Sequence, residues 1–339
     1  MNKTLHQSRS RFHFLLILFS SVLVTGLASV PAAEAQAQNR LFVNTNSFVG
    51  EVDLTTPDRI TTEIFVPPAL GFGESPRDLV VDQNDNIFLF NGTFTPTLLT
   101  RTASTGAIFQ LNIPGFSTTN DLSFGGIGRL DDFVFLTDTN TFMASEQGII
   151  RVDLTDNSFT RFATNISTQD LNIGLDGSLL ALSSQIPADE VLRFDPLTGL
   201  LIETISIPTG SHRSVAGLAD GTFLTATLGG DIFHFDGNGN VINSLEFTGV
   251  FDRFIDIDVA PDGQVAVGTD SFGDVILTTT ALSTFERFST LPSGFSGETF
   301  VTFAQDFSTA AVPEPSTGLV LGICGISFLL QRRRRSFGS

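Results

Sequence analysis

The chain has very few of the residues on which common redox and metal sites depend. Cysteine occurs once, at Cys324, and only His212 and His234 lie between residues 38 and 311. A body without cysteine forms no disulfide and offers no thiolate nucleophile, and two histidines are too few for a zinc site of the usual kind. Its stability must therefore come from burial, for which its roughly 275 residues suffice.

Tryptophan and tyrosine are absent altogether, although phenylalanine occurs 34 times. Sugar sites that work by stacking usually rely on Trp and Tyr, whose rings combine a flat apolar face with a polar edge. The absence weakens the prediction of such a site without excluding it.

Basic residues are also scarce in the body. Residues 38–311 contain 11 arginines, no lysine and 34 acidic residues, so their net charge is about −23. Such a surface repels nucleic acid and anionic lipid, and it lacks the basic stripe that phosphate binding requires. It keeps a secreted protein soluble and can attract divalent cations.

The N-terminus has the three parts of a secretory signal peptide. Positive charges precede an apolar run at residues 14–30, and small-x-small cleavage sites end at Ala35 and Ala37. The positive residues are Lys3, Arg9 and Arg11. We therefore predict a signal peptide over residues 1–37. The alternative is a retained anchor, against which the helix breaker Pro31 argues.

The C-terminus, residues 312–339, also has three parts in a fixed order. A proline-containing motif precedes an apolar stretch of fourteen residues, 317–330, and an arginine cluster follows. The motif is Val312, Pro313, Glu314 and Pro315, and the cluster is Arg332, Arg333, Arg334 and Arg335. The stretch is shorter than the roughly 20 residues of an unstrained membrane span, which predicts a short hydrophobic helix that anchors only marginally.

This tail resembles the PEP-CTERM sorting signal of bacterial surface proteins. The resemblance implies export, processing by signal peptidase and by an exosortase, and a final place at the cell surface, outer membrane or outside the cell. Contact with the membrane would be transient and confined to the tail. It also implies a link to exopolysaccharide or biofilm matrix. Plain tail-anchoring is the alternative, but it gives the Pro-Glu-Pro motif no purpose.

A repeat runs through the body between the two signals. Units with one frame begin at positions 78, 121, 170, 214 and 256, which lie 42 to 49 residues apart. The clearest copies, residues 170–177, 214–221 and 256–263, end in Asp-Gly between two apolar runs, which is a hairpin signal. Each unit therefore reads as four short antiparallel strands, and a unit of this length is typical of a propeller blade.

The sixth unit is split between the two ends of the body. Residues 41–66 supply three strands, and residues 298–304 supply the missing innermost one. Pairing the first strand with the last closes a ring and removes its open edges. We therefore predict an all-β protein, a six-bladed β-propeller closed by strand exchange over residues 38–311, in which phenylalanines fill the gaps between blades. A β-sandwich is the alternative, but it has no reason to repeat at this period.

The frame at residues 74–82, followed by the apolar run at 86–89, resembles NHL-type and gluconolactonase-like six-bladed propellers. No Trp-Asp dipeptide supports a WD-type propeller. The gluconolactonase-like resemblance implies a Ca²⁺ ion in the central channel, held by a mixed Glu, Asn and Asp set. This chain departs from that set, because its frame supplies mostly aspartates, and the departure puts lactonase activity in doubt.

The first position of the frame is the candidate site. It is aspartate in four units and Ser214 in the fifth, and Glu298 lies near the sixth. The aspartates are Asp78, Asp121, Asp170 and Asp256. Inner strands line a propeller's channel, so the carboxylates are expected to ring one mouth of it, where oxygen ligands suit Ca²⁺. Alternatively, each side chain caps backbone N–H groups of the loop that enters its blade.

The leading hypothesis is an exported, non-enzymatic propeller that binds matrix polysaccharide or a surface protein, with no nucleic-acid partner and no resident cofactor. The alternative is a secreted Ca²⁺-dependent, lactonase-like hydrolase that uses the aspartate mouth. His212 could then reach the mouth as a general base, although a surface position is the simpler expectation, and His234 is expected to be a packing residue. No GxSxG, Walker or dinucleotide-binding fingerprint stands in a suitable context, so the sequence names no catalytic residue.

Overall fold

A computed structural model describes the following residues, to which every statement on structure refers: 40–45, 48–56, 59, 61–65, 76–91, 97–113, 125–138, 148–183, 189–247, 253–270, 273–290 and 297–305. The predicted signal peptide and sorting tail lie outside them. In this part of the chain, no helix is long and apolar enough to cross a lipid bilayer.

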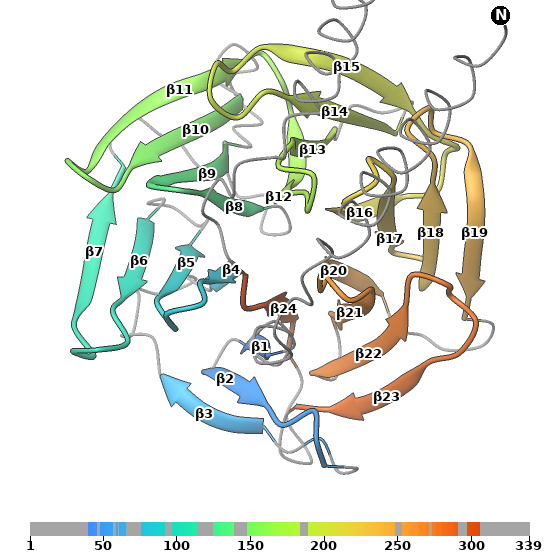
Figure 1. Cartoon of the computed structure of the whole chain (residues 1–339), viewed down its shortest axis with the longest axis horizontal. Coiled ribbons are helices and arrows are strands. Elements are labelled where there is room, and N and C mark those ends of the chain that lie inside the picture. The colour runs from blue at the N-terminus through green and yellow to red at the C-terminus, as the bar shows by residue number, and fades with distance from the viewer. Residues whose placement is uncertain are drawn as a thin grey trace, which may run out of the picture. The chain divides into compact units, whose positions relative to one another are not determined.

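Within the described residues, twenty-four strands form six four-stranded antiparallel sheets arranged around one axis (Figure 1). Five sheets, here blades 1 to 5, each use four consecutive strands. Blade 1 comprises β4 (Pro76–Val81), β5 (Ile87–Asn91), β6 (Thr97–Arg101) and β7 (Ile108–Asn112). Blade 2 comprises β8 (Ile127–Leu130), β9 (Phe133–Asp138), β10 (Gly148–Asp153) and β11 (Ser158–Thr164). Blade 3 comprises β12 (Thr168–Ile173), β13 (Leu179–Ser183), β14 (Glu190–Phe194) and β15 (Leu201–Ser206). Blade 4 comprises β16 (His212–Gly217), β17 (Phe223–Thr227), β18 (Asp231–Phe235) and β19 (Val241–Glu246). Blade 5 comprises β20 (Phe254–Val259), β21 (Gln264–Thr269), β22 (Asp274–Thr279) and β23 (Glu286–Ser289).

Blade 6 joins the two ends of the body. It contains β1 (Leu41–Thr45), β2 (Val49–Val52), β3 (Thr61–Phe65) and, innermost, β24 (Thr299–Phe303). β24 pairs antiparallel with β1, from Leu41 opposite Phe303 to Thr45 opposite Thr299. This pairing confirms the predicted strand exchange. Beyond it, the Gln305 N–H donates to the Val81 carbonyl at 3.1 Å, so the chain also hydrogen-bonds to blade 1.

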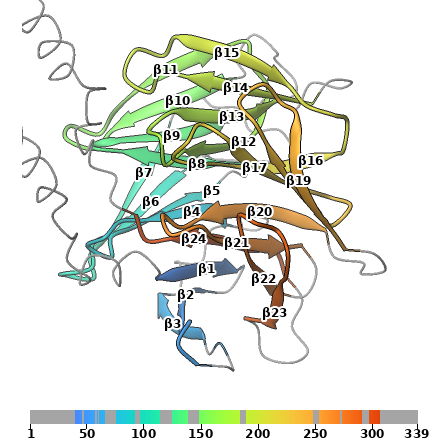
Figure 2. The ribbon, with the colours of Figure 1, turned by 45° about the vertical axis from the view of Figure 1, so that its right-hand side comes forward.

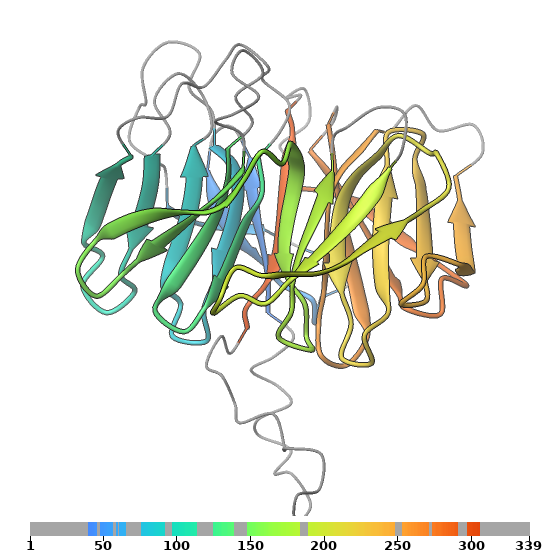
Figure 3. The same cartoon turned by 90° about the horizontal axis from the view of Figure 1, so that it is seen from above.

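The turns confirm the local reading of the sequence. The three Asp-Gly pairs form hairpin turns, with Gly177, Gly221 and Gly263 at φ of 80°, 82° and 89°. Glycine adopts these angles without a steric penalty. The first strand of blades 1 to 5, and β24 in blade 6, lies nearest the axis, and the other strands of each blade follow outward (Figure 1). Figures 2 and 3 show the same blades in two turned views.

The apolar core is divided among the six gaps between neighbouring blades. Each gap holds one cluster of buried side chains. The largest fully buried side chains are seven phenylalanines: Phe42, Phe135, Phe194, Phe223, Phe235, Phe254 and Phe303. Both faces of every blade are thus covered, which confirms the predicted use of phenylalanine as the filler between blades and explains why the inner strands are almost continuously apolar.

Candidate functional site: a carboxylate triad in the channel

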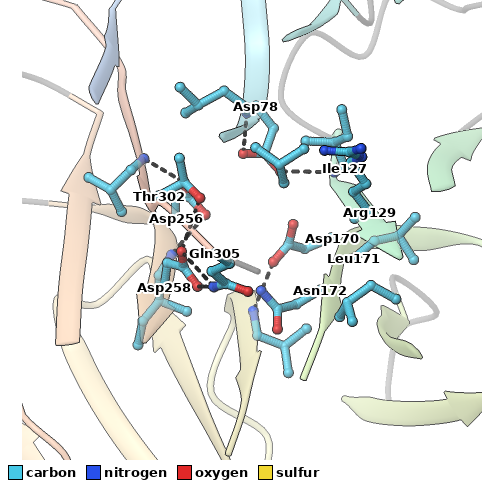
Figure 4. Close-up of a pocket in the computed structure, with 17 residues that line it drawn as sticks. Asp78, Ile127, Arg129, Asp170, Leu171, Asn172, Asp256, Asp258, Thr302 and Gln305 are labelled. Atoms are coloured by element: carbon cyan, nitrogen blue, oxygen red, sulfur yellow. Dashed lines mark hydrogen bonds between the residues drawn. The ribbon is translucent and has the colours of Figure 1, made fainter. Parts of the chain in front are cut away.

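Three of the four predicted aspartates meet in the central channel. Asp78 on β4, Asp170 on β12 and Asp256 on β20 come from alternate blades, and each side chain is about 95% buried. One carboxylate oxygen from each lies within 4.8 Å of the other two. Figure 4 shows the three side chains directed toward a common space. We call them the carboxylate triad.

A β-bulge in the first strand accompanies each of these side chains. The register with the second strand shifts between Pro76 and Asp78, between Thr168 and Asp170, and between Phe254 and Asp256. Blade 4 has the same shift just before Ser214. A bulge bends its strand and re-aims the following side chain, which accounts for the convergence of residues that come from different blades.

Each triad carboxylate accepts a backbone hydrogen bond from the next blade. Asp78 accepts the Ile127 N–H at 2.9 Å, Asp170 accepts the Val215 N–H at 2.8 Å, and Asp256 accepts the Val301 N–H at 2.7 Å. In all three cases the donor lies on the innermost strand of the neighbouring blade: β8, β16 or β24. The sequence did not reveal these hydrogen bonds between blades. The side chains therefore satisfy backbone groups, as the capping alternative predicted, but they do so across blades and not within the loop entering their own blade.

The remaining blades have no carboxylate at the frame position. In blade 4 the Ser214 hydroxyl lies between two triad members, 2.6 Å from Asp170 and 3.2 Å from Asp256. In blades 2, 4 and 6, the residue that follows the frame position donates its backbone N–H to a triad aspartate. In blade 6 that donor is Val301, so the frame position is occupied by Phe300. Glu298, predicted near this position, pairs instead with Arg77 at 3.0 Å.

The prediction for the second unit was wrong in its frame. Its first strand is β8 (Ile127–Leu130), and Gly126 holds the position that Asp78 holds in blade 1, because Ile127 donates to Asp78. Asp121 lies outside the described residues. A Cβ on Gly126 would overlap the Leu171 nitrogen and lie 2.6 Å from an oxygen of Asp170. The backbone of Asp170 passes so close that no side chain fits there, and the Gly125-Gly126 pair was the signal available in the sequence.

We expect Gly126→Ala to lower the free energy of unfolding by about 3 kcal/mol, because the methyl group would force blades 2 and 3 apart at the channel. Urea denaturation followed by circular dichroism measures the change. Gly237→Ala is the matched control, since its Cβ would meet only the Gly221 oxygen, at 3.7 Å. Equal stability of the two variants would contradict the close approach at Gly126.

A second layer of polar side chains lies next to the triad. The Asp258 carboxylate accepts the N–H of Phe303 at 2.7 Å, and Gln305 donates to both of its oxygens at 3.3 and 3.4 Å. In blade 3 the corresponding residue is Asn172, whose side-chain oxygen accepts the Gly217 N–H at 3.2 Å. Asn172 and Asp258 lie two residues after Asp170 and Asp256 on the same strands, and each accepts a backbone hydrogen bond from the next blade, as the triad aspartates do.

Burial makes these carboxylates hard to ionise. It raises the pKa of Asp170 to about 7 and that of Asp258 to about 6. The pKa values of Asp78 and Asp256 are raised well above the usual range, first by burial and then by the charges of the other triad members. The hydrogen bonds from the next blade act in the opposite direction, since they favour the charged form.

The triad alone does not complete a calcium site. One cation could contact all three oxygens, because Ca²⁺–O distances of 2.3–2.6 Å span such a separation. Calcium takes six to eight oxygens, however, and the adjoining cavity of about 20 Å³ has room for about one water molecule.

The mouth of the channel, next to the bulges, is rich in ion pairs. A cavity of about 60 Å³ is lined there by Arg213, Arg253, Asp270 and Glu298, among others. Arg253 pairs with Asp270 at 3.3 Å, and Arg77 pairs with Glu298.

His212 does not serve the mouth. Its ring is buried in blade 4, with Nδ1 2.7 Å from the Thr225 hydroxyl and Nε2 2.9 Å from the Pro208 carbonyl. It packs edge-on against Phe233 and Phe235, and burial lowers its pKa. His212 is therefore a packed residue of blade 4, which corrects both the general-base prediction and the expectation of a surface position.

Comparison with known proteins gives the fold but no family. No protein-family profile matches the chain, and no curated protein matches it. Among solved structures, a chain of a nidogen/laminin complex matches with a TM-score of 0.61 and 10% identity, covering 78% of this chain and 98% of that one. A streptogramin B lyase matches with a TM-score of 0.50 and 10% identity over 78% of this chain and 98% of that chain. A catalytically inactive virginiamycin B lyase of Staphylococcus aureus with quinupristin matches with a TM-score of 0.50 and 13% identity, covering 76% and 86%. These similarities, together with the strand order, establish the fold as an all-β six-bladed propeller.

Proposed function

We propose that this protein is an exported propeller that an exosortase-type protease sorts to the cell surface, where it acts as a binding or structural module of the extracellular matrix. The observation that carries the proposal is the order of three parts at the C-terminus: the Pro-Glu-Pro motif, the short apolar stretch and the arginine cluster. A signal-peptide pattern at the other end and the acidic, cysteine-free body are consistent with it.

Two features of the site favour binding over catalysis. The triad carboxylates are engaged by backbone N–H groups of the next blade, and the cavity that they line, about 20 Å³, has the size of one water molecule. A chain of similar fold occurs in a nidogen/laminin complex, so a propeller of this shape is compatible with a binding role. The partner we propose is a matrix polysaccharide or another surface protein.

Mapping both ends of the mature protein in its native host tests this proposal. We expect the N-terminus near Gln36 or Gln38 and a C-terminus shortened at the sorting tail, as read by N-terminal sequencing and intact mass. Replacing Arg332, Arg333, Arg334 and Arg335 with alanine should abolish tail processing, because the basic cluster holds the apolar stretch in the membrane for the protease. An unprocessed Met1, or processing that the alanines leave unchanged, would refute the sorting function.

A further inference from the structure

A second cavity lies between blades 1 and 2, outside the channel. Its volume is about 310 Å³, within the range of small-molecule sites and far above that of the channel spaces. Blade 1 contributes one sheet face, on which Phe88 is paired with Thr100, Thr100 with Phe109 and Leu98 with Leu111. Blade 2 contributes residues that include Arg129, Asp132, Leu154 and Asn157. We call this cavity the blade 1–2 groove.

At the groove a short residue stands where blades 2 and 3 have an arginine. In blades 2 and 3, Arg151 and Arg193 reach the following blade and donate to the carbonyls of Leu197 at 3.0 Å and Gly221 at 2.7 Å. Thr100 occupies the equivalent position in blade 1. Each of the three residues lies opposite the same position of the second strand of its blade: Arg151 opposite Phe135, Arg193 opposite Leu180 and Thr100 opposite Phe88. A threonine cannot span the gap, so the outer part of this gap stays open.

Each of the remaining gaps is also joined by side chains beyond the first strands. Asn243 donates to the Ala281 carbonyl at 2.6 Å between blades 4 and 5, and Arg59 pairs with Glu286 at 2.8 Å between blades 5 and 6. Arg40 pairs with Asp85 between blades 6 and 1. Beside the groove, the hydrogen bonds between blades 1 and 2 are donated by residues of the innermost strand β8. The Ile127 N–H donates to Asp78, and the Arg129 side chain donates to Asp82.

The lining combines an apolar floor with polar side chains. Phe88, Leu98 and Leu154 contribute apolar surface, and Phe109 on β7 is 47% exposed. Thr100, Asp132 and Asn157 line the same groove, and their side chains make no hydrogen bond within the part of the chain that the structure describes. These three side chains are free to bond a ligand as donors and acceptors.

The charges of the lining balance one another. Arg129 pairs with Asp82 at 2.7 Å and lies 4.3 Å from the centre of the Phe88 ring, so it also separates the groove from the channel. The other charged side chains of the lining are Arg101 and Asp132, of opposite sign. The body around them carries about −23, which disfavours a polyanion.

We propose that the blade 1–2 groove binds an uncharged saccharide segment, with one sugar ring lying against Phe109. Sugars present an apolar C–H face and hydroxyl groups that both donate and accept, which matches an exposed aromatic ring beside Thr100, Asp132 and Asn157. A purely apolar ligand would leave these polar groups unsatisfied, at a cost in affinity. The proposal rests on the proposed matrix function and specifies where on the propeller the polysaccharide binds.

The absence of Trp and Tyr makes the test sharp. Phe109→Trp introduces the only indole into the body, so any change in its emission reports contact at the groove. Phe285→Trp is the matched control, because Phe285 is 51% exposed on blade 5, away from the groove. The probes are cellotetraose, maltotetraose and laminaritetraose, with tetragalacturonate as the anionic arm. We expect a saturable emission change for the Phe109→Trp variant with at least one neutral tetrasaccharide and none for the control.

Loss-of-function variants complete the test. Calorimetry on the body, residues 38–311, should show affinity for the same tetrasaccharide falling about tenfold in Phe109→Ala, and also falling in Asn157→Ala, with no change in Phe285→Ala. If the wild-type body binds neutral tetrasaccharides but the Phe109 variants bind equally well, the groove is the wrong site and the matrix function stands. If the wild-type body binds none of them, both the groove and polysaccharide binding fail. Preference for tetragalacturonate would overturn the uncharged assignment.

Discussion

Deleting residues 298–304 should abolish the cooperative folding of the whole ring. The deletion removes β24, all of whose side chains are buried, and exposes the paired edge of β1. It also removes the Val301 and Phe303 N–H groups, so Asp256 and Asp258 lose their partners from blade 6. A propeller without its closing strand has one newly open sheet edge and two half-covered cores, which typically leads to aggregation. Thermal and urea unfolding of residues 38–311, with and without the segment, measures the loss.

An outer strand of the same ring provides the control. Deleting residues 286–289, which form β23, removes a strand whose side chains are half-buried or exposed. That variant should lose stability but retain one cooperative transition, with hydrogen exchange faster in blade 5 alone. Adding a synthetic peptide of residues 297–305 to the closing-strand variant should restore the transition. A single wild-type-like transition without peptide would show that the ring does not depend on strand exchange.

Closure of the ring could be predicted because its signals are local and repeated. Hairpin turns stand between apolar runs of strand length in the complete units, three of them at Asp-Gly, and the units repeat every 42 to 49 residues. The first unit of the repeat, residues 41–66, has only three strands, and one additional strand, residues 298–304, follows the last complete unit. Pairing this additional strand with the incomplete unit is the arrangement that completes six blades. The structure places that pairing at β1 and β24.

The site could be predicted only as far as the frame reached. Asp78, Asp170 and Asp256 converge because they hold the same frame position, whereas the second unit carries Gly126 there. The bonds from each carboxylate to the next blade could not be read from the sequence, because they depend on how two blades are inclined to each other. His212 was open to two interpretations for a similar reason: whether a residue beside a strand faces the channel or the core is decided by tertiary packing.

The blade 1–2 groove illustrates the same limit. Thr100 is an ordinary strand residue in the sequence, and its meaning appears only when its register is compared with Arg151 and Arg193. A position that repeats across blades thus carries two kinds of information. Where the residue is arginine, in blades 2 and 3, it joins two blades, and where it is Thr100, in blade 1, the outer gap is open.

The free energy of unfolding should fall by several kcal/mol between pH 5 and pH 8, in contrast to proteins whose carboxylates form surface ion pairs. The channel carboxylates have raised pKa values in the folded state, about 7 for Asp170 and about 6 for Asp258, whereas an unfolded aspartate titrates near 3.9. Between these values the folded state binds more protons than the unfolded state, so stability is greatest below the unfolded pKa and is lost as pH rises through the folded pKa. The shift of Asp170 alone corresponds to on the order of 4 kcal/mol.

The turn aspartates set the lower limit of this window. Hydrogen bonds from the Thr222 hydroxyl and N–H lower the pKa of Asp220, and Asn240 has the same effect on Asp236. Their contribution is present above the unfolded pKa and is lost as pH falls through the folded one, so it opposes the triad only in acid. The maximum of stability is therefore expected near pH 4 to 5. Urea denaturation across pH 4 to 9 measures the profile.

Variants separate the triad from the rest of the protein. Asp170→Asn should flatten the fall between pH 5 and pH 8, because an amide does not titrate, while costing about 1–2 kcal/mol at every pH through the hydrogen bond it loses. Asp220→Asn, in an exposed turn, should leave the fall unchanged.

Adding millimolar Ca²⁺ shows whether protons or a bound cation neutralise the charges of the carboxylate triad. If the triad holds protons, Ca²⁺ leaves the profile in place; if it holds the ion, Ca²⁺ restores stability at pH 8 in the wild type but not in Asp170→Asn, because binding to the folded state alone stabilises it. A flat wild-type profile without Ca²⁺ would show that the three carboxylates remain ionised inside the ring, and that the hydrogen bonds from the neighbouring blades outweigh both burial and mutual repulsion.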